Sequence, residues 1–138
     1  MQPSLLLVED CADDIMLAER ALAKNRVQAN MRVARSGREA WDLLGEETGG
    51  PLPKAVFLDL NMPDWNGFDL LRRLRANDRT KSLPVVILTT SKEPADIERS
   101  YELGANSFVT KPVDFMEFSE TFAKMTGYWM NLNEVDAA

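Results

Sequence analysis

One stretch, residues 55–67, constrains the fold of this chain more than any other. It reads A-V-F-L-D-L-N-M-P-D-W-N-G, so an apolar run delivers Asp59 near its end and then breaks at Asn61. Residues 55–60 have the length and the β-branched and aromatic content of a strand that is buried on both faces. An unpaired carboxylate at the end of such a strand is costly. This stretch alone leaves two interpretations open: Asp59 caps a turn, or it takes part in chemistry, because ligands of open α/β sheets bind at the carboxyl ends of the strands.

Apolar runs of the same kind recur along the chain, and helical patterns separate them. The predicted strands cover residues 4–8, 31–34, 55–60, 85–88 and 107–110, and the predicted helices cover residues 13–24, 36–44, 67–76, 94–103 and 114–127. Strands that alternate with helices form a parallel sheet, because the right-handed crossovers place helices on both of its faces. We therefore predict an α/β fold, a flavodoxin-like (βα)5 three-layer sandwich with a five-stranded parallel sheet.

The composition indicates one compact, acidic domain. The chain has 138 residues, of which 45% are hydrophobic, which is enough to bury a core of its own. Its formal net charge is -6, and we expect no nucleic-acid partner, because phosphate backbones are bound through clustered Lys and Arg. The basic residues between positions 72 and 81 recur at helical spacing, which is typical of a solvated helix face.

Two residue types narrow the chemistry. The sequence contains no histidine, which excludes His-based acid–base catalysis, His metal ligation and a phosphohistidine carrier role. Its single cysteine, Cys11, cannot form an intrachain disulfide and suits a reducing compartment; we expect the thiol to be packed. The first apolar run stops at Val8, too short for a signal peptide or a membrane span, so we predict a cytoplasmic protein without membrane contact.

Polar side chains stand at the carboxyl ends of four predicted strands. They are Glu9, Asp10, Asp59, Thr89 and Lys111. In the usual strand order of this class the first and third strands are neighbours at the switch point, so these side chains should gather at one end of the sheet. Three close carboxylates repel one another unless a hard cation lies among them, and oxygen ligands suit Mg²⁺. A cation beside a lysine and a hydroxyl is what phosphoryl transfer requires, and Asp59 is then the candidate nucleophile.

Four motifs, in this order and spacing, resemble the receiver domain of response regulators from two-component signalling. They are L-L-V-E-D ending at Asp10, L-D-L-N-M-P with W-N-G around Asp59, V-V-I-L-T-T containing Thr89, and F-V-T-K-P through Lys111. The resemblance covers nearly the whole chain, from Leu5 to Met125. It implies that Asp59 accepts a phosphoryl group from the phosphohistidine of a sensor histidine kinase.

The resemblance also implies a role for the neighbouring residues. Mg²⁺ would be bound by Asp10, Asp59 and the backbone carbonyl of Asn61, with Glu9 helping through water. Thr89 would contact the phosphoryl oxygens.

The same resemblance assigns the switch. Lys111 would pair with the phosphoryl group, and the Lys111–Pro112 peptide bond would be cis. Phe108, at the position of the switch aromatic, would turn inward when Thr89 is drawn toward the phosphate.

Two other functions are alternatives to this switch. A small aspartyl-phosphate phosphohydrolase would also use Asp59 as a nucleophile. Enzymes of the haloacid-dehalogenase type, however, require a second Asp where Asn61 stands and a cap that covers the substrate. A flavin-binding electron carrier of the same fold needs a phosphate-cradling loop after the first strand. This chain places Glu9, Asp10, Asp13 and Asp14 there, and these would repel a phosphate without metal.

The end of the chain bears on the partners. We predict a receiver domain over residues 1–127 and an aromatic C-terminal extension over residues 128–138, which either folds back or reaches a partner. The predicted interaction surface comprises Ile97, Tyr101, Met116, Tyr128 and Trp129. The V-E-D-x-x-D-D opening and the Y-W-M-N-L tail together resemble the stand-alone receivers that serve bacterial phytochromes, which implies a sensor kinase of that kind and a homodimer.

Overall fold

The protein is built on one parallel sheet. A computed structural model describes residues 4–45 and 50–135 of the chain. The strands are β1 (Ser4–Val8), β2 (Asn30–Ala34), β3 (Ala55–Leu58), β4 (Val85–Thr89) and β5 (Ser107–Thr110), in the order β2-β1-β3-β4-β5. All four neighbouring pairs are parallel. The order reverses between β1 and β3, so the topological switch point lies between these two strands.

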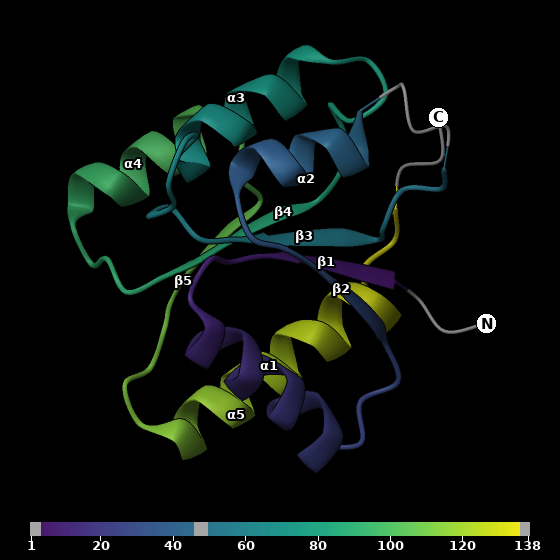
Figure 1. Cartoon of the computed structure of the whole chain (residues 1–138), viewed down its shortest axis with the longest axis vertical. Helices are drawn as coiled ribbons and strands as arrows, with labels where there is room; N and C mark the ends of the chain where they lie inside the picture. The colour runs from purple at the N-terminus through teal and green to yellow at the C-terminus, as the bar shows by residue number, and fades with distance from the viewer. Residues whose placement is uncertain (1–3, 46–49, 136–138) are drawn as a thin grey trace.

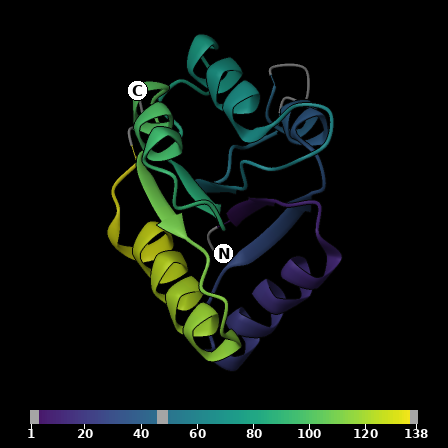
Figure 2. The ribbon, with the colours of Figure 1, turned by 90° about the vertical axis from the view of Figure 1, so that its left-hand side faces the viewer.

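Helices cover both faces of the sheet, which confirms the predicted three-layer, flavodoxin-like fold (Figure 1). On one face α1 (Ala12–Lys24) packs beside α5 (Phe115–Gly127). On the other face lie α2 (Gly37–Leu44), α3 (Gly67–Ala76) and α4 (Pro94–Glu102). The view from the left-hand side of Figure 1 shows the same two helix layers with the sheet between them (Figure 2).

The strands divide their side chains between two cores. Because successive side chains of a strand point to opposite faces, Leu6 and Val56 pack under α2 and α3, whereas Leu5 and Phe57 pack under α1 and α5. Every residue of β3 and β4 is buried. This burial on both faces explains why the two strands read as continuous apolar runs rather than as alternating patterns.

The helix ends follow local chemistry. The Ser36 hydroxyl accepts a hydrogen bond from the Glu39 amide at 3.0 Å and begins α2. A complete capping box between Asn66 and Asp69 begins α3. After α4, Gly104 has a φ of 101°, a left-handed conformation that glycine adopts without strain.

Part of the tail folds back on the domain. Residues Tyr128–Leu132 form a π-helical turn, η2, directly after α5. Met130 is 1% exposed and belongs to the core under α1 and α5, and Trp129 packs against the same core. The Lys54 ammonium donates a hydrogen bond to the Met130 carbonyl at 2.8 Å. Tyr128 and Leu132 remain exposed, so the turn buries one side and presents the other to solvent.

Apart from one-residue differences at the ends of elements, three sequence-based expectations differ from the structure. β3 ends at Leu58 rather than at residue 60, because Asp59 already turns toward the site and its carboxylate accepts from the Asn61 amide. Cys11 is exposed, not packed, because it is the N-cap residue of α1 and precedes the first buried turn. No peptide bond among the described residues is cis, so the bond before Pro112 is trans, the form that X-Pro bonds also favour intrinsically.

Candidate functional site

Asp59 is held at the carboxyl end of the sheet by its backbone. Its amide donates to the Val8 carbonyl at 3.1 Å, which ties it to the end of β1. Gly67 lies against it from the start of α3: a Cβ atom at Gly67 would come within 2.6 Å of the Asp59 carbonyl oxygen. Only glycine fits this approach. Asp59 itself is 7% exposed, so the fold places a carboxylate in a nearly closed setting.

Two further carboxylates arrive from the end of β1. Glu9 is 2% exposed, its amide donates to the Ala34 carbonyl of β2, and its carboxylate accepts from the Cys11 amide at 3.2 Å. Asp10 follows and is exposed. One carboxylate oxygen of each of Glu9, Asp10 and Asp59 lies within 4.8 Å of the others. The structure therefore brings the three predicted acidic ligands together.

Lys111 neutralises part of this charge. It follows β5, its amide donates to the Thr89 carbonyl at 2.7 Å, and its side chain is 7% exposed. The ammonium forms an ion pair with Glu9 and lies 3.3 Å from an oxygen of Asp59. It also lies 2.9 Å from Asp14 on α1. Three carboxylates thus converge on one buried ammonium.

The electrostatics of Glu9 and Lys111 follow from this convergence. Burial raises the pKa of Glu9 to about 7, and the Asp59 charge adds to this effect, while Lys111 opposes it. Burial lowers the pKa of Lys111, but its bonds to Glu9 and Asp14 and the Asp59 charge outweigh burial and raise that pKa above its usual range. Lys111 is therefore charged at neutral pH, whereas Glu9 titrates there.

The acidic group fits a hard cation. All of its donors are carboxylate oxygens, one of its members is open to solvent, and Glu9 and Asp59 are buried with only part of their charge balanced by Lys111. Oxygen ligands of this kind suit Mg²⁺, Mn²⁺ or Ca²⁺. Asn61, whose carbonyl was predicted to complete the ligand set, is exposed beside the group, and its amide donates to Asp59 at 3.3 Å.

The two predicted switch residues lie on neighbouring strands. Thr89 is completely buried at the end of β4, and its hydroxyl oxygen accepts from the Ser91 amide at 3.4 Å. Phe108 is half-buried on β5 and packs against the core under α2 and α3. The amide of Phe108 donates to the Tyr101 hydroxyl at 3.1 Å, which links α4 to this strand.

The predicted interaction residues do not form one cluster of contacts. Tyr101 is 50% exposed on α4, with Ile97 half-buried one turn before it. Met116 is exposed on α5, where its sulfur accepts from the Lys24 ammonium of α1 at 3.1 Å. Tyr128 and Trp129 belong to η2 and pack edge to face, with ring centroids 5.0 Å apart.

Asp14 is the site residue that the sequence analysis missed. The sequence analysis names Asp14 only as one of the acidic residues that follow the first strand. The structure instead places it against Lys111. No signal in the sequence distinguishes Asp14 from Asp13, because only the contact with the distant Lys111 singles it out.

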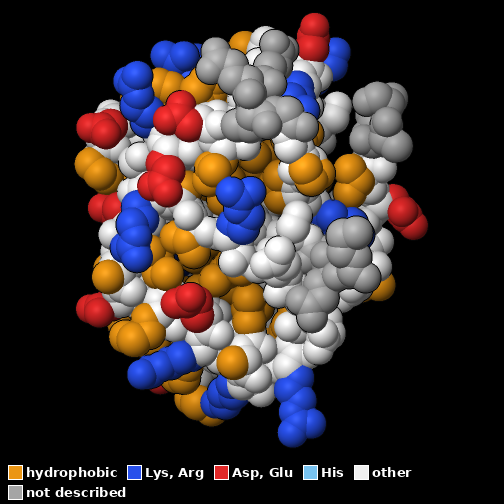
Figure 3. Space-filling view, turned by 45° about the vertical axis from the view of Figure 1, so that its right-hand side comes forward, with side chains coloured by type: hydrophobic (Ala, Val, Ile, Leu, Met, Phe, Trp, Pro, Cys, Tyr) orange, Lys and Arg blue, Asp and Glu red, His pale blue; other side chains and the backbone are white. Residues whose placement is uncertain are grey.

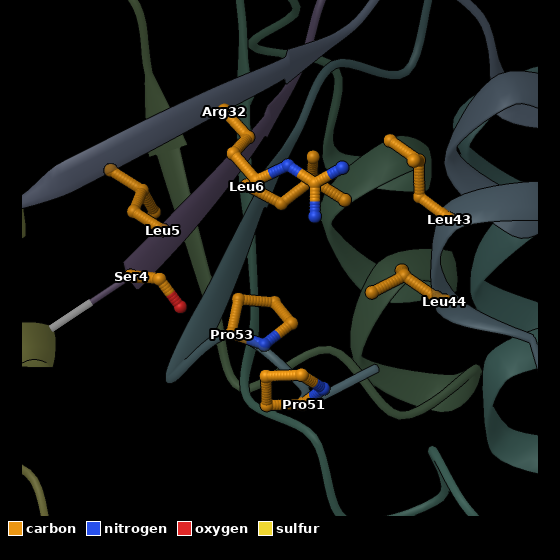
Figure 4. A pocket seen from close by; sticks show the side chains of 8 residues that line it. All are labelled: Ser4, Leu5, Leu6, Arg32, Leu43, Leu44, Pro51 and Pro53. Atoms are coloured by element: carbon orange, nitrogen blue, oxygen red, sulfur yellow. The ribbon is translucent and has the colours of Figure 1, made fainter. Parts of the chain in front are cut away.

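A pocket elsewhere on the molecule shares no residue with this site. It lies at the amino end of β1, between β2, the end of α2 and the segment before β3 (Figure 4). It is lined by Ser4, Leu5, Leu6, Arg32, Leu43, Leu44, Pro51 and Pro53. Apolar side chains also gather across the face shown in Figure 3. Arg32 is the one charged residue of the lining, so the carboxylate site remains the place where chemistry is concentrated.

Comparison with known proteins identifies the family. The family described as the response regulator receiver domain matches residues 5–123. The chain belongs to this family. The match covers the five strands, apart from Ser4 of β1, and the site residues from Glu9 to Lys111.

Curated relatives agree with the family match. The chain is 34% identical over 131 residues to the probable methanogenesis regulatory protein FilR2 of Methanothrix harundinacea, covering 94% of this chain and 84% of the relative. It is 31% identical over 137 residues to the response regulator Rcp1 of Synechocystis, covering 97% and 93%. Both alignments cover more than four fifths of the relative as well as more than nine tenths of this chain.

Solved structures of response regulators have the same fold as this chain. The phosphorylated cyanobacterial phytochrome response regulator RcpA matches with a TM-score of 0.90 and 30% identity, over 99% of this chain and 100% of that one. The Mn²⁺-bound form of Rcp1 matches with a TM-score of 0.86 and 30% identity, over 98% and 99%. One relative has thus been seen phosphorylated and another with a divalent metal. Among the described residues of the present chain, no helix is long and apolar enough to span a bilayer.

Proposed function

We propose that this receiver is a single-domain phosphorylation switch in which Asp59 accepts a phosphoryl group with the help of Mg²⁺. The observation that carries the proposal is the convergence of a buried Asp59, a charged Lys111 and the acidic group at the carboxyl end of the sheet. In the transfer, an Asp59 carboxylate oxygen forms a bond to phosphorus while the bond from phosphorus to a phosphohistidine nitrogen breaks. The electron pair of that bond stays on the imidazole of the kinase.

The chain's own residues prepare this step. Lys111 would pair with the phosphoryl oxygens, and Thr89 would donate its hydroxyl to them. Glu9, Asp10, Asp59 and the Asn61 carbonyl would hold Mg²⁺, which supplies charge neutralisation on the phosphoryl oxygens when bound.

The proposed output is a change of surface rather than of a metabolite. We infer that the protein is not an enzyme, apart from promoting its own phosphorylation and dephosphorylation. Asn61 stands where a phosphohydrolase of the haloacid-dehalogenase type needs an Asp. Movement of Thr89 toward the phosphoryl group would draw Phe108 inward. The Tyr101 hydroxyl, which now accepts from the Phe108 amide, would carry that movement to α4 and its exposed surface.

A sensor histidine kinase is the proposed partner, and the similarity to RcpA and Rcp1 supports a kinase of the phytochrome type. A kinase of this class presents its phosphohistidine in the cytoplasm, so we place the protein there. The division into a receiver over residues 1–127 and an extension over 128–138 stays a prediction, and residues 136–138 lie outside the described part of the chain.

A homodimer formed through the tail is also proposed. Tyr128, Leu132 and Val135 expose apolar surface on and after η2, and a second copy would cover it. Removing residues 128–138 would also remove Met130 from the core, so Leu132→Asp is the better variant. Its mass in light scattering should be lower than that of the wild type. A wild-type protein that is already monomeric at high concentration would exclude the dimer.

Intact mass after incubation with acetyl phosphate tests the central proposal. With Mg²⁺ the wild type should gain one phosphoryl group, and without Mg²⁺ or in Asp59→Asn it should gain none. Asp42→Asn is the control, because Asp42 is an exposed carboxylate on α2 outside the site and gives the same change in charge. A phosphoryl group retained in Asp59→Asn would overturn the site assignment.

A further inference from the structure

The Lys111 ammonium has no spare donor. An ammonium carries three N–H groups, and three carboxylates lie around this one: Glu9, Asp14 at 2.9 Å and Asp59 at 3.3 Å. Any phosphoryl oxygen that pairs with Lys111 must therefore displace one of them. Which carboxylate gives way determines how readily Lys111 becomes available.

Two of the three carboxylates also belong to the candidate cation site. Glu9 and Asp59 belong to the acidic group that fits a cation, and Asp14 does not. When Glu9 and Asp59 bind a cation, that cation neutralises much of the negative charge that they present to Lys111, while Lys111 remains buried. A buried ammonium without a counter-charge is costly. Asp14 is, among the described residues, the one carboxylate that can keep Lys111 paired at that stage.

Asp14 is also the partner that is easiest to release. Its side chain is 32% exposed, against 3% for Glu9 and 10% for Asp59. Water can solvate Asp14 when Lys111 turns away, whereas the other two carboxylates would be left buried. Release from Asp14 therefore costs the least.

We propose that Asp14 is a positioning residue for Lys111. It holds the ammonium while Glu9 and Asp59 serve the cation, and it then competes with the phosphoryl group for the same ammonium. This inference rests on the proposed function and deepens it. It requires that loss of Asp14 affects the two binding events in opposite directions.

The variant Asp14→Asn removes the charge and keeps the shape. In the metal-free protein Lys111 would then rely on Glu9 and Asp59 alone, so Mg²⁺ binding should weaken, by about fivefold for an ion pair of partial exposure. At saturating Mg²⁺, Lys111 would be free of its competitor. Beryllofluoride, a tetrahedral mimic of a phosphoryl group, should then bind about three- to fivefold more tightly.

Both affinities can be measured by calorimetry on the full chain. Asp13→Asn is the matched control, because Asp13 is an exposed carboxylate in the same first turn of α1 and gives the same change in net charge. We expect Asp13→Asn to change each affinity less than twofold. Asp14→Glu, which restores the charge on a longer side chain, should move both affinities back toward the wild type. Circular dichroism of each variant verifies folding.

The outcomes separate the inference from the proposed function. Opposite shifts in Asp14→Asn, absent in Asp13→Asn, support the positioning role. Two affinities that shift together, two that do not shift, or a control that reproduces the split would overturn it. If wild-type protein binds Mg²⁺ but not beryllofluoride, the proposed phosphoryl site itself fails and the inference falls with it.

Discussion

Met130 is the side chain that fastens the C-terminal tail to the domain, and we predict that Met130→Ala lowers the free energy of unfolding by about 2–3 kcal/mol. Met130 is 1% exposed within the core under α1 and α5, so truncation leaves a cavity in this core, which also contains Phe57 and Phe122. We take the lower part of the range for buried Met because a segment near the chain end can partly collapse. The hydrogen bond from Lys54 to the Met130 carbonyl would persist unless the turn undocks.

Urea unfolding monitored by circular dichroism measures this change, and a thermal scan should show a midpoint about 8–12 °C lower, at about 4 °C per kcal/mol for a domain of this size. Leu132→Ala is the matched control from the same π-helical turn, because Leu132 is 72% exposed. Its effect should stay within about 0.5 kcal/mol. Equal unfolding free energies for the two variants would show that the tail is not docked in solution and would refute the reasoning.

Two further predictions concern the site. Gly67→Ala would place a Cβ 2.6 Å from the Asp59 carbonyl oxygen and 2.8 Å from the Leu60 Cα, both backbone atoms, so we expect a loss of about 2 kcal/mol or more in urea unfolding together with weaker Mg²⁺ binding. Gly127→Ala meets nothing within 4 Å at the end of α5 and should be neutral or stabilising; if both variants behave alike, the close approach at Gly67 does not constrain the site. Because burial raises the pKa of Glu9 to about 7, protons compete with the cation below that pH, and calorimetric Mg²⁺ affinity should rise by up to about tenfold per pH unit until pH 7 and then level off. In Glu9→Gln the affinity should be lower and this slope absent, and an unchanged slope would assign the titration to another group.

The fold was largely predictable because its signals are local. The two central strands read as buried runs, since helices cover both faces of the sheet. The helix predicted over residues 67–76 has those bounds, because Asn66 and Asp69 cap it from within the sequence. The gathering of Glu9 and Asp59 followed from strand order alone, since parallel strands bring their carboxyl ends to one edge.

The features that escaped prediction depend on tertiary contacts. Asp14 and Asp13 look alike in the sequence, and only the position of Lys111, far along the chain, distinguishes them. Cys11 was predicted to be packed from the usual burial of free thiols, whereas its place in the loop before α1 leaves it open. The tail offered no periodicity that would indicate which of its aromatic and apolar residues is buried, and the structure selects Met130.

The parallel sheet separates the two working ends of the molecule. Asp59 and its neighbours follow the strands, whereas Lys54, which holds the tail turn, precedes β3 at the other end. A dimer formed through the tails would leave the carboxylate cluster of each chain facing outward and accessible to a kinase. The stoichiometry would then remain one phosphoryl group per chain in both the monomer and the dimer. A dimer with one phosphorylated chain would be a discrete species that native mass spectrometry can quantify.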